Sequence, residues 1–185
     1  MKFKKFNFKN VNSTNDIAIR LIRKTNNKFG IIVADKQKKG RGRFGRKWIS
    51  YKGNLFVSLF FSLEKINLSL KQLTKVNCLL IKKLLSQYYE NKILIKPPND
   101  LFVNKKKICG ILQETITKAN ANYFIVGVGI NLIKSPTINN YPTTSILELT
   151  KINVSKKKII LELISLYENF VNQFSKSNLK TIKNL

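Results

Sequence analysis

A series of short apolar segments, each bounded by polar or turn-forming residues, limits the possible folds of this chain more than any other feature. Their composition, rich in Ile, Val, Leu and Phe, and their length are typical of β-strands. The N-terminal residues 1–9, which alternate Phe with Lys and Asn, predict one more strand. Polar residues around Asn120 and Asn122 suit a hairpin turn between the last two segments. The predicted strands are Ile31–Ala34, Asn54–Phe61, Ile93–Ile95, Leu101–Val103, Ile108–Thr115 and Tyr123–Leu132.

Other parts of the chain place their apolar residues at helical spacing. Residues 13–16 (Ser-Thr-Asn-Asp) offer helix caps, Ile17, Leu21 and Ile22 follow, and Gly30 is expected to end that segment. Leu68–Tyr89 and Ser155–Phe174 carry longer apolar stripes with the period of a helix. We therefore expect an α+β fold in which one mixed sheet has its helices packed to one side. With 185 residues, the chain suits a single domain covering 1–185.

Several classes of protein are excluded by composition. A hydrophobic content of 43% is too high for a disordered chain, and no apolar run is long enough to span a membrane. Cys78 and Cys109 provide neither a disulfide framework nor the usual zinc site, so a reducing cytoplasm is the simplest location. The chain has no His, which rules out Ser-His-Asp triads and Cys-His pairs.

The charge of the chain is strongly positive, because 35 Lys and Arg face 9 Asp and Glu and give a net charge of +26. Such a surface attracts phosphates, acidic proteins or nucleic acid. However, Lys, Asn and Ile are abundant throughout, as an AT-rich coding sequence would produce, and the lysines do not gather on one predicted helix. We favour this compositional interpretation and do not expect DNA to be the partner.

The first cluster of residues that could bind or activate a ligand is the arginine-rich loop Gly40–Trp48, with the sequence GRGRFGRKW. It overlaps a polar stretch from Asp35 to Lys47 that we expect to be a mobile loop. Its glycines allow close approach of a ligand to the backbone, and its guanidinium groups can clamp phosphates or carboxylates. The same pattern occurs in RGG-like nucleic-acid-binding segments. Its place between two predicted strands favours a ligand-binding loop.

Two further clusters follow the second predicted helix. In Lys96–Asp100, KPPND, the side chains of Asn99 and Asp100 suit Mg²⁺, a ribose or a phosphate. Lys107 is a point charge that could reach a phosphate or carboxylate, although it also continues a solvated lysine run. In GVGIN, Gly127–Asn131, the glycines open space beside a strand, or they mark a bulge.

Taken together and in this order, these motifs resemble the biotin–protein ligase family. The resemblance covers about Val11 to Leu132 and rests on Ser13-Thr14-Asn15, GRGRFGRKW, KPPND, KKICGILQE (Lys106–Glu114) and GVGINL. It implies a mostly antiparallel sheet and an enzyme, biotin–[acetyl-CoA-carboxylase] ligase. Such an enzyme joins biotin to AMP, with ATP and Mg²⁺, and then transfers biotin to a lysine of a biotin carboxyl carrier domain of acetyl-CoA carboxylase or a related carboxylase.

The resemblance also implies roles for individual residues. Lys107 matches the catalytic lysine, which acts with Arg41 and Arg43, and Asp100 is a candidate metal ligand. The residues expected to bind biotin are Ser13, Thr14, Asn15, Gln37, Gly40, Arg41, Gly42, Arg43, Trp48, Lys107 and Gly110. Those expected to bind the nucleotide are Arg43, Arg46, Lys47, Trp48, Asn99, Asp100, Lys107 and Asn131. Helix capping is the alternative role for Ser13 and Thr14, and core packing is that for Trp48.

The chain departs from the family pattern in several places. The family usually has Trp where Pro97 stands, so we expect one pocket wall to be rebuilt. Cys109 takes a position that is usually small and apolar, and we expect it to be buried. The chain is expected to have neither the N-terminal helix-turn-helix of bifunctional relatives nor a complete C-terminal β-barrel domain. The resemblance also allows a homodimer formed through a sheet edge.

Two other functions are compatible with parts of the sequence. A lipoate or octanoate ligase or transferase shares the expected fold, but these enzymes lack the arginine-rich loop Gly40–Trp48. A transferase would also need Cys109 as its nucleophile. A basic nucleic-acid-binding module would explain the charge and the Arg-Gly loop without any catalysis.

Overall fold

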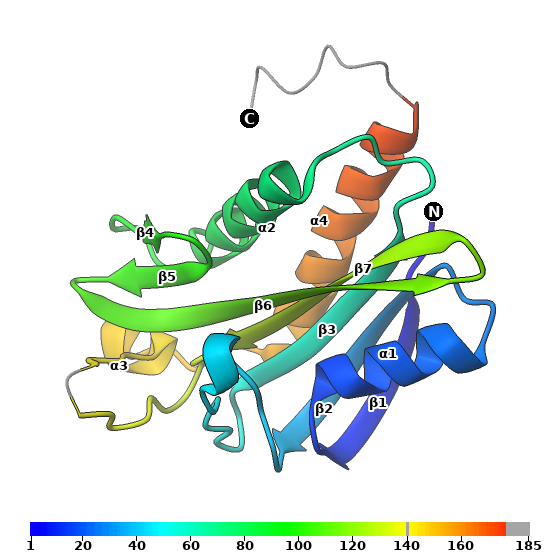
Figure 1. Ribbon diagram of the computed structural model, residues 1–185. Coiled ribbons are helices and arrows are strands. Elements are labelled where there is room, and N and C mark those ends of the chain that lie inside the picture. The colour runs from blue at the N-terminus through cyan, green and yellow to red at the C-terminus, as the bar shows by residue number, and fades with distance from the viewer. Residues whose placement is uncertain (140, 177–185) are drawn as a thin grey trace.

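The computed structural model describes residues 1–139 and 141–176 as a sheet with helices on both of its faces (Figure 1). The helices are α1 (Thr14–Lys24), α2 (Leu70–Leu85), α3 (Ile146–Thr150) and α4 (Lys156–Lys176), with a 3₁₀ turn η1 (Arg43–Gly45). The strands are β1 (Lys4–Val11), β2 (Phe29–Gln37), β3 (Leu55–Ser62), β4 (Leu94–Lys96), β5 (Asp100–Val103), β6 (Lys106–Lys118) and β7 (Ala121–Ile130).

The strands form one seven-stranded sheet in the order β1-β2-β3-β7-β6-β5-β4. The pair β1·β2 is parallel and every other pair is antiparallel, so the predicted mixed, mostly antiparallel sheet is confirmed. β6 and β7 form the predicted hairpin. Its turn is at Ala119 and Asn120, whose φ angles of 45° and 63° are typical of tight hairpin turns.

Two local predictions were incorrect or incomplete. Gly30 does not end the first helix, which stops at Lys24; it lies inside β2. A Cβ at Gly30 would come within 2.4 Å of the Phe60 ring, so glycine is needed there for close packing rather than for a helix end. The five-residue helix α3 was not predicted, because it is too short to show a period; a capping box between Ser145 and Glu148 defines its start.

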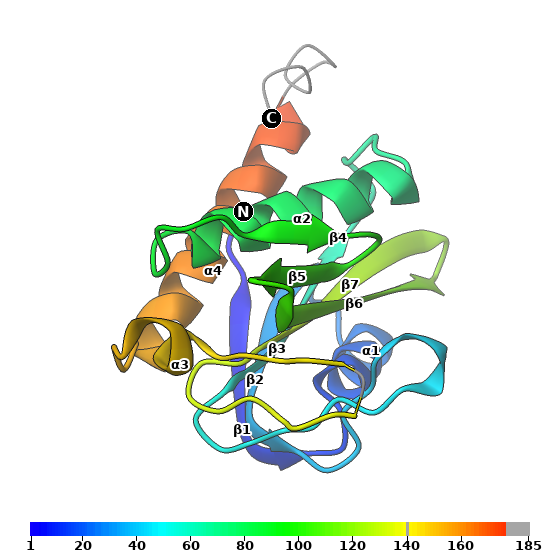
Figure 2. The same ribbon diagram turned by 90° about the vertical axis from the view of Figure 1, so that its left-hand side faces the viewer.

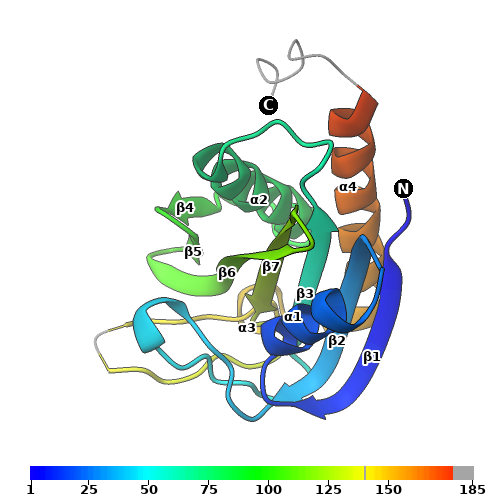
Figure 3. The same ribbon diagram turned by 45° about the vertical axis from the view of Figure 1, so that its right-hand side comes forward.

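The two faces of the sheet are covered unequally. α2 and α4 pack on one face over the large apolar core, as predicted (Figure 3). The expectation that all helices pack to one side is wrong for α1, which covers the opposite face. There Ala18 and Ile22 pack against Ile32, Phe60 and Ile125. Alternate residues of the central strands point to opposite faces, so both faces present apolar side chains that need cover.

The face of the sheet that α1 covers changes from apolar side chains to glycines along β7. Phe124, Val126, Val128 and Ile130 point toward α2 and α4, while Ile125 packs under α1. The next positions on the α1 side are Gly127 and Gly129, which pair with Leu112 and Gly110 of β6 without a register shift. These glycines therefore do not mark a bulge. They leave β7 without side chains on this face just beyond the N-terminus of α1.

Asn54, buried before β3, fixes the segment that follows β7. Its Oδ1 accepts hydrogen bonds from the backbone N–H groups of Leu132, Ile133 and Lys134 at 3.0, 2.9 and 3.2 Å. Its Nδ2 donates to the carbonyl of Lys134 at 2.6 Å. One side chain thus satisfies three consecutive backbone donors and directs the chain toward residues 136–139 and 141–143, which lie beside the arginine loop in Figure 2.

Among the described residues, no helix combines the length and the apolar character needed to cross a membrane. This agrees with the absence of long apolar runs in the sequence.

We predict that Asn54→Ala lowers the free energy of unfolding by about 2–3 kcal/mol, because several buried backbone donors lose their acceptor at once. Urea denaturation followed by far-UV circular dichroism measures this change. The matched control is Asn12→Ala at an exposed position, which should shift stability by less than about 0.5 kcal/mol. An equal loss in both variants would contradict the role assigned to Asn54.

Candidate active site

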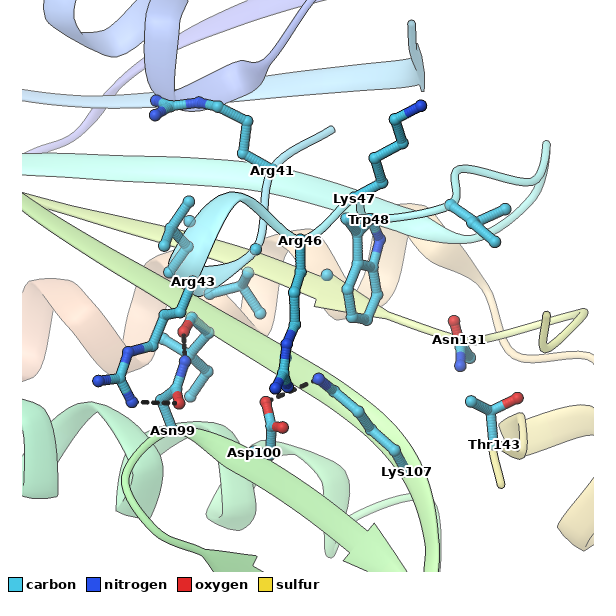
Figure 4. A pocket seen from close by; sticks show the side chains of 18 of the residues that line it. Arg41, Arg43, Arg46, Lys47, Trp48, Asn99, Asp100, Lys107, Asn131 and Thr143 are labelled. Atoms are coloured by element: carbon cyan, nitrogen blue, oxygen red, sulfur yellow. Dashed lines mark hydrogen bonds and ion pairs between the residues drawn. The ribbon is translucent and has the colours of Figure 1, made fainter. Parts of the chain in front are cut away.

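A single cavity of about 870 Å³ opens on the α1 side of the sheet, where β7 and β6 carry their glycines. Its walls come from the N-terminus of α1, the arginine loop, the start of β5, the first half of β6 and the segment after β7 (Figure 4). Every residue predicted to bind biotin or nucleotide lines this cavity except Gly40. Gly40 is buried just behind it, where a Cβ would lie 2.6 Å from the carbonyl oxygen of Trp48.

One end of the cavity consists of neutral hydrogen-bonding groups. Gln37 Oε1 accepts from the backbone N–H of Thr14 at 2.8 Å and from its hydroxyl at 3.1 Å. Ser58 Oγ, fully buried, donates to Thr14 Oγ1 at 2.7 Å. Ser13 occupies the N-cap position of α1, but its hydroxyl makes no capping bond to the described backbone. The capping role is therefore not the one that Ser13 plays, and its buried hydroxyl stays available to a ligand.

Asn15, the third residue of that motif, is bound within the protein. Its Nδ2 donates to Glu114 Oε2 at 2.6 Å and to the carbonyl of Leu112 at 3.3 Å, and its Oδ1 accepts from Ser58 Oγ. A Cβ at Gly127 would lie 2.3 Å from Asn15 Oδ1, so glycine is required there. Asn15 lines the cavity as predicted, while its amide holds α1 against β6 and β3.

The floor of the cavity is a slot formed by two glycines and filled by Trp48. Gly110 and Gly129 are cross-strand partners, and a Cβ at either would come within 2.7 Å or 2.5 Å of the indole. The indole Nε1 is buried and has no hydrogen-bond partner among the described residues. Trp48 therefore forms a wall of the ligand cavity rather than a part of the apolar core.

The arginine loop, Gly40–Trp48, folds into a small hairpin over the cavity. Gly42 N–H donates to the carbonyl of Arg46 at 2.7 Å, and Trp48 N–H donates to that of Gly40 at 2.9 Å. At its tip, Phe44 has φ 55° and is 84% exposed. A left-handed backbone conformation is energetically unfavourable for a bulky residue such as Phe44. The hydrogen bonds along the hairpin must therefore stabilise this turn.

The other end of the cavity is cationic. Lys107 Nζ forms an ion pair with Asp100 Oδ1 at 2.8 Å and lies 5.4 Å from the ring centres of both Trp48 and Tyr141. Tyr141 donates its hydroxyl to Asp100 Oδ2 at 2.8 Å. Burial, with help from this hydrogen bond, raises the pKa of Tyr141 to about 12, so its hydroxyl stays a donor. Tyr141 thus orients the carboxylate of Asp100, and the ion pair with Asp100 in turn fixes the ammonium group of Lys107.

Arg43 and Arg46 reach this end from the loop, as Figure 4 shows. Arg43 Nη1 donates to Asn99 Oδ1 at 3.4 Å, and Asn99 Nδ2 donates to the carbonyl of Ile111. Lys47 also lines the cavity, and Asp100 is the one carboxylate among the described lining residues. This end therefore presents an excess of positive charge, which suits a phosphate or carboxylate ligand.

The sequence analysis missed the rim formed by Pro136, Ile138, Asn139, Tyr141 and Thr143. Backbone bonds join this segment to the start of β6: Lys107 N–H donates to the carbonyl of Pro142, and Thr144 N–H donates to that of Lys107, both at 2.9 Å. Asn131, predicted to bind nucleotide, lines the cavity but uses its Nδ2 to bond the carbonyl of Thr144 at 3.1 Å. Polar residues near prolines gave no signal in the sequence that distinguished this rim from an ordinary loop.

The residues at the cationic end do not fit a divalent cation held by the protein itself. Both carboxylate oxygens of Asp100 are bonded, one to an ammonium group. The described residues contain no group of three His, Cys, Asp or Glu side chains that could hold a metal. Mg²⁺ requires several oxygen ligands. A magnesium ion here would therefore arrive with the phosphates of a nucleotide.

Cys109 lies on β6 beneath the site but is fully buried in the large core. Burial raises the pKa of its thiol well above the ordinary value. A protonated and inaccessible thiol is a poor nucleophile. The expectation that Cys109 is a buried small residue is confirmed.

Comparison with known proteins gives a consistent result. Residues 8–131 match the model of the biotin/lipoate A/B protein ligase family. The chain is 36% identical over 102 residues to the bifunctional ligase/repressor BirA of Escherichia coli, which covers 54% of this chain and 32% of that protein. It is 32% identical over 171 residues to biotin–protein ligase 2 of Arabidopsis thaliana, covering 84% of this chain and 49% of that protein.

A solved structure supports the same relationship. The biotin protein ligase from Aquifex aeolicus in complex with biotin and ATP superposes with a TM-score of 0.79 at 29% identity, covering 95% of this chain and 73% of that one. The chain thus spans about a third to a half of the length of the two curated relatives above.

Trp48 is the one tryptophan of the chain, which makes the glycine slot directly measurable. We predict that Gly129→Ala expels the indole from the slot. Its fluorescence emission then shifts to longer wavelength and becomes easier to quench with acrylamide, while stability falls by about 1–3 kcal/mol. In the control Gly42→Ala, where the nearest atom is 3.4 Å from a new Cβ, the emission should stay unchanged. Unchanged emission in Gly129→Ala would disprove the slot.

Proposed function

Because the chain belongs to the biotin/lipoate A/B protein ligase family, we propose that it acts as a biotin–protein ligase. In the first step ATP and biotin form biotinyl-5′-AMP with release of pyrophosphate. In the second step biotin is transferred to a lysine of a carrier domain. Family membership alone leaves the acid open, since the family name covers both biotin and lipoate. The choice of biotin rests on the cavity.

The observation that carries this proposal is the division of one cavity into a neutral polar end and a cationic end. Ser13, Thr14 and Gln37 supply hydroxyl and amide groups that both donate and accept hydrogen bonds. A ureido ring presents one carbonyl acceptor and two N–H donors, which such a set can satisfy. At the other end, Lys107, Arg43 and Arg46 face the region where a carboxylate and a nucleotide phosphate would meet.

The chemistry of the first step follows from these positive charges. A carboxylate oxygen of biotin attacks the α-phosphorus of ATP, the bond from that phosphorus to the bridging oxygen breaks, and pyrophosphate leaves. Two anions must approach each other, so the cations that hold them together lower the barrier. Lys107 is the best placed, because Asp100 and two aromatic rings fix its ammonium group at the cavity wall. Arg43 and Arg46 supply further charge, and Mg²⁺ enters as part of the MgATP substrate.

In the second step the carrier lysine attacks the carbonyl carbon of the mixed anhydride. A C–N bond forms, the carbonyl C–O bond to AMP breaks, AMP leaves as an anion with its charge shared by three phosphate oxygens, and the attacking nitrogen loses a proton to solvent. The carrier we propose is the biotin carboxyl carrier domain of acetyl-CoA carboxylase or of a related carboxylase. We also propose a cytoplasmic location for this protein, because its two cysteines are free thiols that suit a reducing compartment.

Lipoate or octanoate fits the neutral end less well. The dithiolane ring and the alkyl chain offer almost no hydrogen bonds, so Ser13, Thr14 and Gln37 would lose water without gaining partners. Leaving such groups unpaired costs about 1–3 kcal/mol each. A transferase that uses a cysteine is opposed by the buried and protonated thiol of Cys109. These two arguments favour biotin among the acids of the family.

The decisive test is biotin-dependent exchange of labelled pyrophosphate into ATP. We expect exchange with biotin and not with lipoate, and Lys107→Gln should lower its rate by about a hundredfold to a thousandfold. Lys106→Gln is the matched control, because Lys106 is the preceding residue of β6 but is exposed outside the cavity. It should keep the wild-type rate. Exchange that requires lipoate, or no exchange with either acid in folded wild-type protein, would refute the proposal.

The net charge of +26 leads to a separate prediction about the carrier. We expect the basic surface to attract an acidic carrier domain over long distances, which accelerates encounter but not adenylation. Raising the salt concentration from about 50 mM to about 200 mM should then lower kcat/KM for transfer about tenfold. Pyrophosphate exchange, measured in parallel, should change much less. Equal effects on the two steps would contradict steering, and tight, salt-sensitive binding of DNA or RNA without any exchange would favour a nucleic-acid-binding module.

A further inference from the structure

Arg41 points away from the cationic end of the cavity. Figure 4 shows its side chain directed to the opposite side from Asp100 and Lys107. Its Nη2 forms ion pairs with Asp16 Oδ1 at 2.8 Å and with Glu114 Oε2 at 3.0 Å. The guanidinium group that lies nearest to α1 is therefore bound to two carboxylates of the protein. This arrangement differs from the catalytic and biotin-binding role that the sequence analysis expected for Arg41.

Glu114 is the better fixed of these two carboxylates. It lies in the middle of β6, its side chain is 26% exposed, and that of Asp16 is 48% exposed. The same oxygen that binds Arg41 also accepts from Asn15 Nδ2 at 2.6 Å. Asn15 is in turn held by Ser58 and by the carbonyl of Leu112. The carboxylate of Glu114 is thus anchored to the buried part of the neutral end.

Apart from the Trp48 indole in the glycine slot, the described part of the chain shows few other short polar contacts between the arginine loop and the sheet. The hydrogen bonds Gly42–Arg46 and Trp48–Gly40 lie within the loop itself. Arg43 reaches Asn99 only at 3.4 Å, near the limit of a hydrogen bond. The Arg41–Glu114 contact is charge-assisted and shorter, so it contributes more to holding the loop over the cavity.

We propose that Glu114 is a positioning residue that fixes the arginine loop through Arg41. The chain of contacts Ser58–Asn15–Glu114–Arg41 links the neutral end of the cavity to the loop that covers the cationic end. In this arrangement Arg41 anchors the loop, while Arg43 and Arg46 face the substrates. The consequence for catalysis, which rests on the proposed function, is that Glu114 keeps the loop closed over biotinyl-5′-AMP until the carrier arrives.

Glu114→Gln tests this proposal, because it removes the charge and keeps the shape and the hydrogen-bonding capacity of the side chain. The probe of loop position is chymotrypsin cleavage after Phe44, identified by the masses of the two fragments. We expect cleavage about fivefold faster in Glu114→Gln, the change that loss of one ion pair of about 1 kcal/mol produces. The matched control is Glu64→Gln, which removes the Lys28–Glu64 ion pair remote from the loop and should leave cleavage unchanged.

A double-substitution test separates this role from a general structural one. If Glu114 acts through Arg41, Glu114→Gln should add nothing to the cleavage rate of Arg41→Gln. Additive effects would overturn the proposal, as would an unchanged cleavage rate in Glu114→Gln. A fall in thermal midpoint with faster cleavage at sites throughout the chain would also overturn it, because that pattern indicates global destabilisation rather than release of the loop.

The last readout concerns the intermediate. With ATP and biotin but no carrier, we expect Glu114→Gln to release free biotinyl-5′-AMP about fivefold faster than the wild type, in line with its cleavage rate. Release at the wild-type rate from a loop that is cleaved faster would refute the retention of the intermediate. If the wild type forms no adenylate at all, the proposed function fails, and the cleavage and double-substitution results still decide whether Glu114 positions the loop.

Discussion

The structure depends on the alternation of side chains along β7, where one face packs on the large core and the other changes from apolar residues to glycines. Phe124, Val126, Val128 and Ile130 bind the sheet to α2 and α4. On the opposite face Gly127 and Gly129 leave room for Asn15 and for the indole of Trp48. Because neighbouring residues of a strand must point to opposite faces, a strand can be central to the core and still form the floor of a cavity. The fold and the site are therefore determined by the same ten residues of β7.

The few carboxylates, rather than the many cations, set the orientation of the charged side chains at the cavity. The chain has 9 acidic residues, and Asp16, Asp100 and Glu114 all bind cations at or beside the cavity. Asp100 places Lys107 toward the cavity, and Glu114 with Asp16 draws Arg41 away from the cationic end of the cavity. In a chain with so much positive charge, a cation is present almost everywhere. Its orientation is what distinguishes a functional cation from a solvated one, and a neighbouring carboxylate sets that orientation.

Much of the fold was predictable because it rests on local patterns. The short apolar segments and the helical stripes correspond to strands and helices of the structure, with shifted ends. The side of the sheet that α1 covers was not predictable, since both faces of the central strands are apolar there and the sequence does not say which helix meets which face. The role of Gly30 was misassigned for a similar reason: its close neighbour, Phe60, is thirty positions away and comes from a different strand.

The sequence by itself determined the longer elements, the class of fold and many of the residues that gather at the cavity, because residue type and spacing along the chain carry that information. Only the tertiary structure decided what each side chain does there. Asn15 and Asn131 were expected to bind ligands, yet their amides hold backbone and side chains from distant segments. Glu114 ends the Lys106–Glu114 motif that carries the family resemblance but was given no role there, and it connects α1, β6 and the arginine loop. Such roles depend on partners up to about a hundred residues apart, and only folding brings those partners within hydrogen-bond distance.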